Sequence, residues 1–89
     1  MPISYNALKN EMNIRDRGLS FEAVRDLDMS SALIVEDTRK GYEERRFQAL
    51  GLIEARLHML VFTPRGNKMH VISLRKANIR EIKRYEQAQ

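Results

Sequence analysis

The sequence contains no cysteine, and only two prolines and four glycines among its 89 residues. The lack of cysteine excludes disulfide bonds and thiolate metal sites. No uninterrupted apolar run exceeds four residues, so the sequence shows neither a membrane-spanning helix nor a secretory signal. A chain of this size buries about 60% of its unfolded surface, and residues 1–89 are therefore expected to form one domain with a modest core. We expect a cytoplasmic protein.

Positive charge is concentrated in the C-terminal part of the chain. The formal net charge is +4, and seven of the sixteen Lys and Arg residues follow Pro64, where only two residues are acidic. A basic surface on a small domain is typical of binding to nucleic acid or to an acidic protein. It is equally compatible with a solvated face that keeps the protein soluble.

The stretch from Leu57 to Arg75 predicts an antiparallel hairpin. Two apolar runs flank Gly66-Asn67, and glycine accepts the positive φ that a tight turn needs. Equal steps outward from the turn predict these pairs: Arg65 with Lys68, Phe62 with Val71, Leu60 with Ser73, and His58 with Arg75.

Strand alternation then predicts two unlike faces for this hairpin. One face is apolar near the turn and polar at the other end, and it carries Leu60, Phe62, Val71, His58, Ser73 and Arg75. The other face is expected to be core, and it carries Met59, Val61, Ile72 and Leu74. The polar end of the first face is where the sheet would leave its helical cover and offer charge to a ligand.

Local signals predict a helical hairpin before the sheet. Asn6 can cap a helix over residues 7–17, and Gly18 is placed to end it. Ser20 can cap a second helix, in which apolar residues recur at helical spacing.

The remaining segments are read from propensity and capping. Residues 32–35 are apolar and β-branched, which predicts a strand, and residues 38–41 are turn-like. Residues 42–57 are rich in helix formers, so propensity alone predicts a helix. Asn78 and Glu81 form a capping-box signature for a last helix, whose Ile79, Ile82 and Tyr85 are expected to face inward.

Three stretches carry motifs that occur in the same order in a known family. The first holds Tyr5-Asn6, Lys9, Asn13, Asp16-Arg17-Gly18 and Ser20-Phe21-Glu22-Ala23; the second holds Glu36-Asp37-Thr38, Glu44, Arg46-Phe47, Ala49 and Gly51; the third holds Val61, Thr63, Arg65-Gly66, Val71-Ile72-Ser73, Arg75, Ala77, Glu81 and Tyr85. Together they resemble the BrnT toxins of bacterial type II toxin–antitoxin systems, which have a RelE-like fold. The chain departs from the family pattern at Asp16-Arg17-Gly18, where the family shows Lys-His-Gly, and at Tyr5, where tryptophan is usual.

The resemblance implies a fold that overrules one propensity-based prediction. In the family the segment around Arg46 is a strand, so residues 46–52 are expected to pair with residues 57–63 across a turn near Glu54. The expected fold class is α+β and RelE-like: roughly four antiparallel strands, packed by the N-terminal helical hairpin and the C-terminal helix.

The resemblance also implies a function. The family consists of ribonucleases that act without metal or cofactor and inhibit translation. A BrnA-like antitoxin with a ribbon-helix-helix DNA-binding domain would neutralise the toxin. The complex would repress its own operon, so that the toxin contacts operator DNA only through the antitoxin. Two other classes stay open: a domain that binds RNA or DNA without cutting it, and a module that serves mainly to bind its antitoxin.

RNA cleavage needs a proton acceptor, cations for the phosphate and a proton donor. Arg75 is the first candidate for the phosphate cation, because a guanidinium offers paired donors; the alternative is a salt bridge to an acid of the last helix. Arg46 could join it from the neighbouring strand, or could instead pair with Glu44 or Asp37.

Tyr85 could stack on a base or pass a proton, or it could be a core aromatic. His58 is the histidine predicted beside Arg75 and is a candidate proton carrier, whereas His70 is expected on the other face as a strand-edge residue. The candidate contacts to the RNA backbone are Arg65, Lys68, Lys76 and Arg84.

Overall fold

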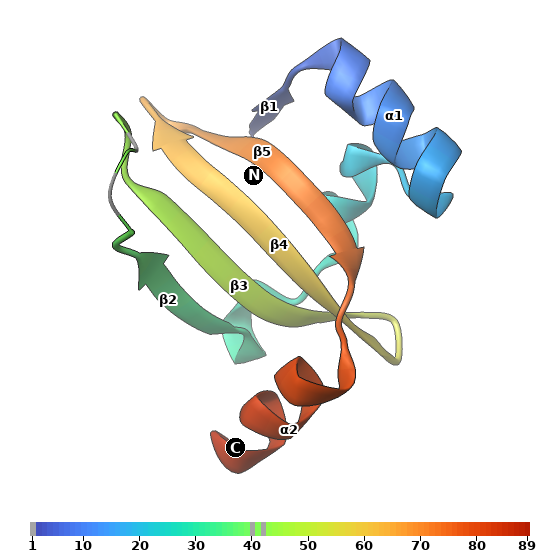
Figure 1. Cartoon of the computed structure of the whole chain (residues 1–89), viewed down its shortest axis with the longest axis vertical. Helices are drawn as coiled ribbons and strands as arrows, with labels where there is room; N and C mark the ends of the chain where they lie inside the picture. Colours follow the sequence, from blue (N-terminus) through green and yellow to red (C-terminus); the bar gives the residue numbers. More distant parts are fainter. Residues whose placement is uncertain (1, 40, 42) are drawn as a thin grey trace.

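A five-stranded sheet in the order β1-β5-β4-β3-β2 forms the centre of the molecule (Figure 1). The computed structural model describes residues 2–39, 41 and 43–89. The strands are β1 (Ile3–Tyr5), β2 (Leu33–Asp37), β3 (Arg46–Ile53), β4 (Arg56–Arg65) and β5 (Lys68–Lys76). The helical elements are α1 (Ala7–Arg17), the 3-10 helices η1 (Phe21–Asp26) and η2 (Met29–Ser31), and α2 (Ile79–Gln87).

The α+β class is confirmed, but the sheet is mixed rather than fully antiparallel. β1 pairs in parallel with β5, whereas the other neighbouring strands are antiparallel. Strand β1 was not predicted, because a strand of three residues is too short to show an alternating pattern. No helix in the described part of the chain is long and apolar enough to cross a membrane.

The predicted pairing of residues 46–52 with residues 57–63 is confirmed. β3 and β4 pair from Phe47↔Phe62 to Ile53↔Arg56, and Glu54 turns the chain with φ 56. The helix that propensity predicts here is wrong, because successive β3 residues are buried on opposite sides of the sheet. Lys40 and Tyr42, which belong to the predicted turn and to the start of that helix, lie outside the described residues.

The β4–β5 hairpin turns at Gly66 and Asn67 as predicted, and Gly66 has φ 60. The predicted pairs Arg65↔Lys68 and Phe62↔Val71 are confirmed. Beyond them the register shifts by one, because Ile72 is an extra residue that forms a β-bulge in β5. The remaining predicted pairs are therefore wrong, and the observed pairs are Leu60 with Leu74, Met59 with Arg75, and His58 with Lys76.

The bulge reverses the predicted faces of the β5 residues that follow Ile72. Leu74 is fully buried beside Leu60, on the side of the sheet covered by η1. Arg75 lies on the opposite face with Met59, the face on which α2 packs. Without the bulge, the Arg75 guanidinium would lie in the core beneath η1, where an unpaired charge is costly.

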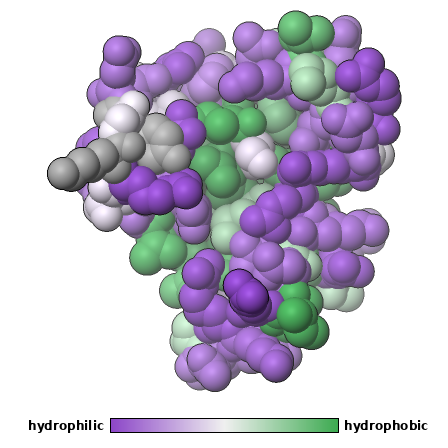
Figure 2. Space-filling model, viewed as in Figure 1, coloured by the Kyte–Doolittle hydropathy of each residue, from purple (hydrophilic) through white to green (hydrophobic). Residues whose placement is uncertain are grey.

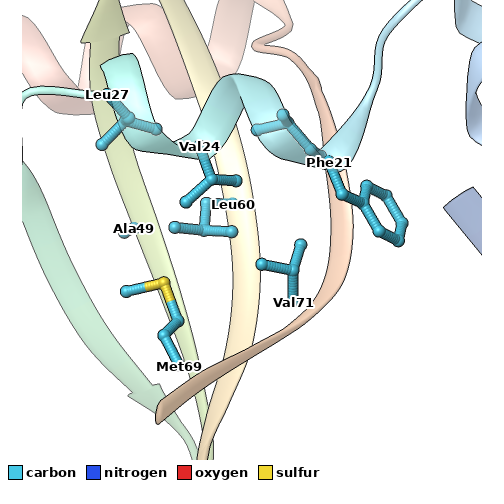
Figure 3. Packing of buried hydrophobic residues seen from close by; sticks show 8 residues of the cluster. Phe21, Val24, Leu27, Ala49, Leu60, Met69 and Val71 are labelled. Atoms are coloured by element: carbon cyan, nitrogen blue, oxygen red, sulfur yellow. The ribbon is translucent and has the colours of Figure 1, made fainter. Parts of the chain in front are cut away.

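The second predicted helix is a 3-10 helix, η1, and Ser20 caps it as predicted. Its apolar residues Phe21, Val24 and Leu27 recur every third residue, which matches the three residues per turn of a 3-10 helix. All three side chains are buried; Val24 and Leu27 lie over Leu60 and Ala49, whereas the Phe21 ring points away from them (Figure 3) and packs against Tyr5.

Both α-helices begin at their predicted caps. Asn6 caps α1, which ends at a left-handed Gly18, and α2 has the complete capping box of Asn78 and Glu81. Ile82 and Tyr85 pack on the cluster of Leu50, Leu57, Met59 and Ala77, as predicted, but Ile79 is 67% exposed rather than inward. α2 thus covers only one end of its face of the sheet (Figure 1).

We expect Gly51→Ala to destabilise the domain by about 1–3 kcal/mol, as overpacking of a core does. A Cβ at Gly51 would lie 2.5 Å from Leu27 Cδ2, so the buried Leu27 side chain would have to move from its position on β3. The urea midpoint measures the loss. Leu8→Ala is the control, since Leu8 is 65% exposed and its truncation should cost at most about 0.5 kcal/mol. An unchanged urea midpoint for Gly51→Ala would mean that Leu27 does not pack against Gly51.

Candidate functional site

Three clefts follow one another along β5. The hairpin cleft, of about 230 Å³, includes Arg46, Thr63 and Ile72. The α1 cleft, of about 290 Å³, lies between α1 and β5 and also includes Ile72. The β5-end cleft, of about 410 Å³, shares Arg17 with the α1 cleft. Because neighbouring clefts share a lining residue, they adjoin one another, and the three together are called the groove here. Figure 2 shows hydrophobic surface in the middle of this side of the molecule, between hydrophilic regions.

The α1 cleft exists because β1 is short. β1 pairs only with Met69–Val71, so further along no described strand covers the outer edge of β5. α1 lies there instead (Figure 1), and Asn13 fixes it by donating from Nδ2 to the carbonyls of Leu19 and Leu74, each at 2.9 Å. The side-chain amide of Asn13 therefore takes the place that a further strand would occupy.

One side of α1 supplies the polar residues of this groove. Lys9, Asn13 and Arg17 are spaced four residues apart, which places them on the same side of a helix. β5 supplies Ser73 from the facing wall. These α1 residues were noted in the sequence only as parts of motifs; their four-residue spacing was the signal that could have marked them as a functional face.

The β5-end cleft brings three cations together: Arg17, Arg75 and Lys76. The Arg75 guanidinium also donates two hydrogen bonds to Glu81, each 2.8 Å long, so the expected alternative of a salt bridge to a helix acid is present. The hydrogen bond with Glu81 raises the pKa of Arg75, and the same bond lowers the pKa of Glu81. Because the Arg75 side chain keeps 34% exposure, it is both held in place and accessible.

The hairpin cleft combines cations with carboxylates. Arg46 pairs across the strands with Asp37, whose pKa falls to about 2, chiefly through hydrogen bonds from Arg39, with a smaller contribution from Arg46. Arg65 forms two hydrogen bonds with Glu44, of 2.7 and 2.9 Å, and both side chains stay about half exposed. The predicted RNA contact at Arg65 is thus already in an ion pair.

The two histidines lie on opposite faces of the sheet. The prediction that His58 lies beside Arg75 is wrong, because the bulge puts His58 opposite Lys76; its ring is buried, with Nδ1 2.9 Å from the Arg56 carbonyl oxygen. His70 shares the face of Arg75 and is not at a sheet edge, since β1 pairs with it at Ser4.

Burial lowers the pKa of His70 below its usual value. The charges of Arg65 and Lys9 act in the same direction, and Glu44 opposes them. Lys9 belongs to the α1 cleft and Glu44 to the hairpin cleft, so the ring lies near the junction of the two. Its Nδ1 is 3.0 Å from Ser4 Oγ, and within the described part of the chain Nε2 has no hydrogen-bond partner.

The groove does not include every predicted residue. Tyr85 packs in the α2 core and donates its hydroxyl to the Ser31 carbonyl at 3.3 Å, on the β2 side of the sheet. Lys68 is exposed at the hairpin tip, and Arg84 is exposed on α2. Among the described residues, no group of three or more His, Asp or Glu side chains could hold a metal ion.

Residues 5–81 match the family model described as "Ribonuclease toxin, BrnT, of type II toxin-antitoxin system". The match runs from β1 to the first turn of α2 and therefore spans both walls of the groove. A comparison with curated proteins found no match.

We expect Glu81→Gln to lower the free energy of unfolding by ~1–2 kcal/mol at pH 7, because a partly buried, charged hydrogen-bonded pair is lost. The folded pKa of Glu81 is lowered, so its contribution is present above the ordinary value of about 4.3 and is lost as the pH falls through the folded value. Urea unfolding of both proteins at pH 7 and pH 3 measures this.

The difference between wild type and Glu81→Gln should therefore shrink at pH 3. Glu86→Gln, which neutralises an exposed acid of the same helix, should change stability by no more than about 0.5 kcal/mol at either pH. A Glu81→Gln deficit that is the same at both pH values would contradict the role of the ion pair.

Proposed function

The chain belongs to the BrnT family of ribonuclease toxins of type II toxin–antitoxin systems, and we propose that it is a metal-independent endoribonuclease whose RNA lies in the groove along β5. The observation that carries the proposal is the row of four cations, Lys9, Arg17, Arg75 and Lys76, along two joined clefts. A row of cations matches the repeating charges of a phosphate backbone. The charges of a surface that is merely solvated need not form a row.

The proposed chemistry is attack of a ribose 2′-hydroxyl oxygen on the neighbouring phosphorus, which breaks the bond from phosphorus to the 5′-oxygen of the next nucleotide. The products are a 2′,3′-cyclic phosphate and a 5′-hydroxyl, whose proton comes from water. Negative charge grows on the phosphate oxygens as the new bond forms, and a cation beside the phosphate stabilises it.

Lys9, which lines the α1 cleft and whose charge acts on His70, is the proposed cation beside this phosphate. Arg75 lies five residues after His70 on β5, roughly 15 Å away at the rise of a strand, so it would hold a phosphate further along the RNA, with its guanidinium kept in one orientation by Glu81. Arg17 reaches the cleft of Arg75 from α1 and would contact the same or the next phosphate.

His70 is the proposed proton acceptor. Its lowered pKa keeps the ring neutral near pH 7, and a neutral imidazole can take the 2′-hydroxyl proton through Nε2. Ser4 would orient the ring through Nδ1. In this proposal Arg46, Lys68 and Arg84 serve as backbone contacts outside the reacting centre, and His58 and Tyr85 stabilise the fold.

The proposal extends to the biology of the family. We assign the chain a RelE-like fold and a cytoplasmic site of action, where it would inhibit translation by cutting RNA. Its antitoxin would be BrnA-like, with a ribbon-helix-helix domain through which the complex represses its own operon. The exposed side chains of Leu8, Ile34, Val35 and Ile79, each at least 44% accessible, support a protein partner that covers them.

We expect the purified protein to cleave an end-labelled RNA equally well with and without EDTA, and Arg17→Ala to slow cleavage at least about tenfold, the effect of one lost charge-assisted contact. Arg15→Ala is the matched control: it removes the same charge from the same turn of α1, but Arg15 lines none of the three clefts. Its effect should stay below about threefold, since a distant exposed charge is screened.

The outcomes separate the candidate functions. Cleavage that stops with EDTA would contradict the metal-independent mechanism. Binding of RNA without cleavage would favour a non-catalytic binding domain. Equal losses for Arg17→Ala and Arg15→Ala would remove the groove from the proposal and leave a diffuse positive field.

We expect His70→Gln to slow cleavage by ~10²–10⁴-fold, the usual range for loss of a general base. Wild-type activity should fall as the pH drops through the lowered pKa of His70, below about 6.5, because the protonated ring cannot accept the 2′-hydroxyl proton. Initial rates between about pH 5 and 8 measure this. A variant that is slower but keeps the same acidic fall in rate would show that His70 has only a structural role.

A further inference from the structure

The α1 cleft differs in chemistry from the β5-end cleft beside it. Its walls include the apolar side chains of Met12, Phe21 and Ile72, with polar groups of α1 and Ser73 of β5 beside them. The β5-end cleft is lined mainly by cations. Apolar walls with a polar edge suit a nucleobase, which has hydrophobic faces and a hydrogen-bonding rim, whereas a cationic cleft suits phosphate.

Asn13 presents a fixed acceptor in this cleft. Both of its Nδ2 hydrogens go to carbonyl oxygens, of Leu19 and Leu74. Because carbonyl oxygens only accept, the amide cannot be turned around without losing both bonds. Oδ1 is therefore the group that the amide leaves for a ligand, and a ligand atom that meets it must be a donor.

Asp16 adds a second acceptor to the same cleft. Its side chain is 62% exposed, and its ion pair with Arg15 is long at 3.6 Å and solvated. Such a pair contributes little, about 0–1 kcal/mol. A carboxylate in the last turn of α1 also faces the negative end of the helix dipole, so helix stability does not explain its presence there.

We propose that the α1 cleft binds a guanine base of the RNA, with the Asp16 carboxylate accepting the neighbouring N1–H and N2–H groups. Guanine is the one standard base whose Watson–Crick edge offers two adjacent donors, and these match the two oxygens of a carboxylate. Asn13 Oδ1 can take a further donor of the nucleotide. The proposal rests on the proposed function, because it names the base that the RNA-cleaving groove prefers.

The position of Arg17 links this base site to the cations of the β5-end cleft. Arg17 follows Asp16 directly and lines both the α1 cleft and the β5-end cleft. A nucleotide with its base in the first cleft would place an adjoining phosphate beside Arg17 at the entrance to the second. Asp16 and Arg17 would thus read the base and hold its phosphate.

The test uses four short RNA oligonucleotides that differ only in one central base, and a fifth with inosine there. Cleavage by wild type should favour guanine at least about tenfold over adenine, cytosine and uracil, and inosine, which lacks the N2 amino group, should fall between. Asp16→Asn replaces one carboxylate oxygen by a donor and should abolish the preference, by lowering cleavage of the guanine oligonucleotide to the level of the other three.

Glu11→Gln is the matched control, since it neutralises an exposed acid of α1 that lines none of the three clefts, and it should keep the guanine preference. Equal cleavage of all four bases by wild type, or a guanine preference that survives Asp16→Asn, would overturn the inference.

Binding separates the inference from the proposed function. The same five sequences with 2′-deoxyribose at the central position cannot be cut there, and fluorescence anisotropy measures their affinity. A guanine preference in binding that disappears in Asp16→Asn supports the base site even if no RNA is cleaved, an outcome that would count against the nuclease alone. Binding with no base preference would overturn the base site even if RNA is cleaved.

Discussion

The extra residue in β5, Ile72, is the constraint on which both the core and the groove depend. Side chains of a strand alternate between faces, so one inserted residue reverses the orientation of every residue after it. Leu74 thereby enters the core beneath η1, and Arg75 turns to the α2 face, where it meets Glu81. Ile72 itself lines two clefts and joins them. The same residue thus sets the core packing and aims the proposed phosphate-binding cation.

A second consequence of the topology is an incomplete edge. β1 covers only the first part of β5, and the uncovered part faces α1 across the groove. Asn13 bonds the Leu74 carbonyl from the helix, which keeps the two walls at a fixed distance without filling the space between them. An open strand edge is usually a liability, because it invites pairing with other strands. Here the helix shields it, and the shielding element carries the cations.

Local features of this fold were predictable from sequence, and non-local ones were not. Asn6, Gly18, Gly66 and the Asn78–Glu81 box act through their own backbone neighbourhoods, and each ends or begins an element where predicted. The bulge depends on how both faces of the sheet pack at once, which the local sequence does not show. Pairing residues in equal steps from the turn therefore placed Arg75 beside His58, which is wrong. The groove was not predicted either, because its walls come from residues that are distant in sequence. The match to the family model confirms the predicted family.

The central claim is that RNA lies along the groove between α1 and β5. Nitrogen-15 spectra of the labelled protein, titrated with an uncleavable 2′-deoxy-substituted RNA, test it most directly. The account predicts that the largest changes fall on the amides of Lys9, Asn13, Arg17 and Ser73, while β2 at the far edge of the sheet stays unchanged. Changes centred on β2, or on the η1 side of the sheet, would contradict it.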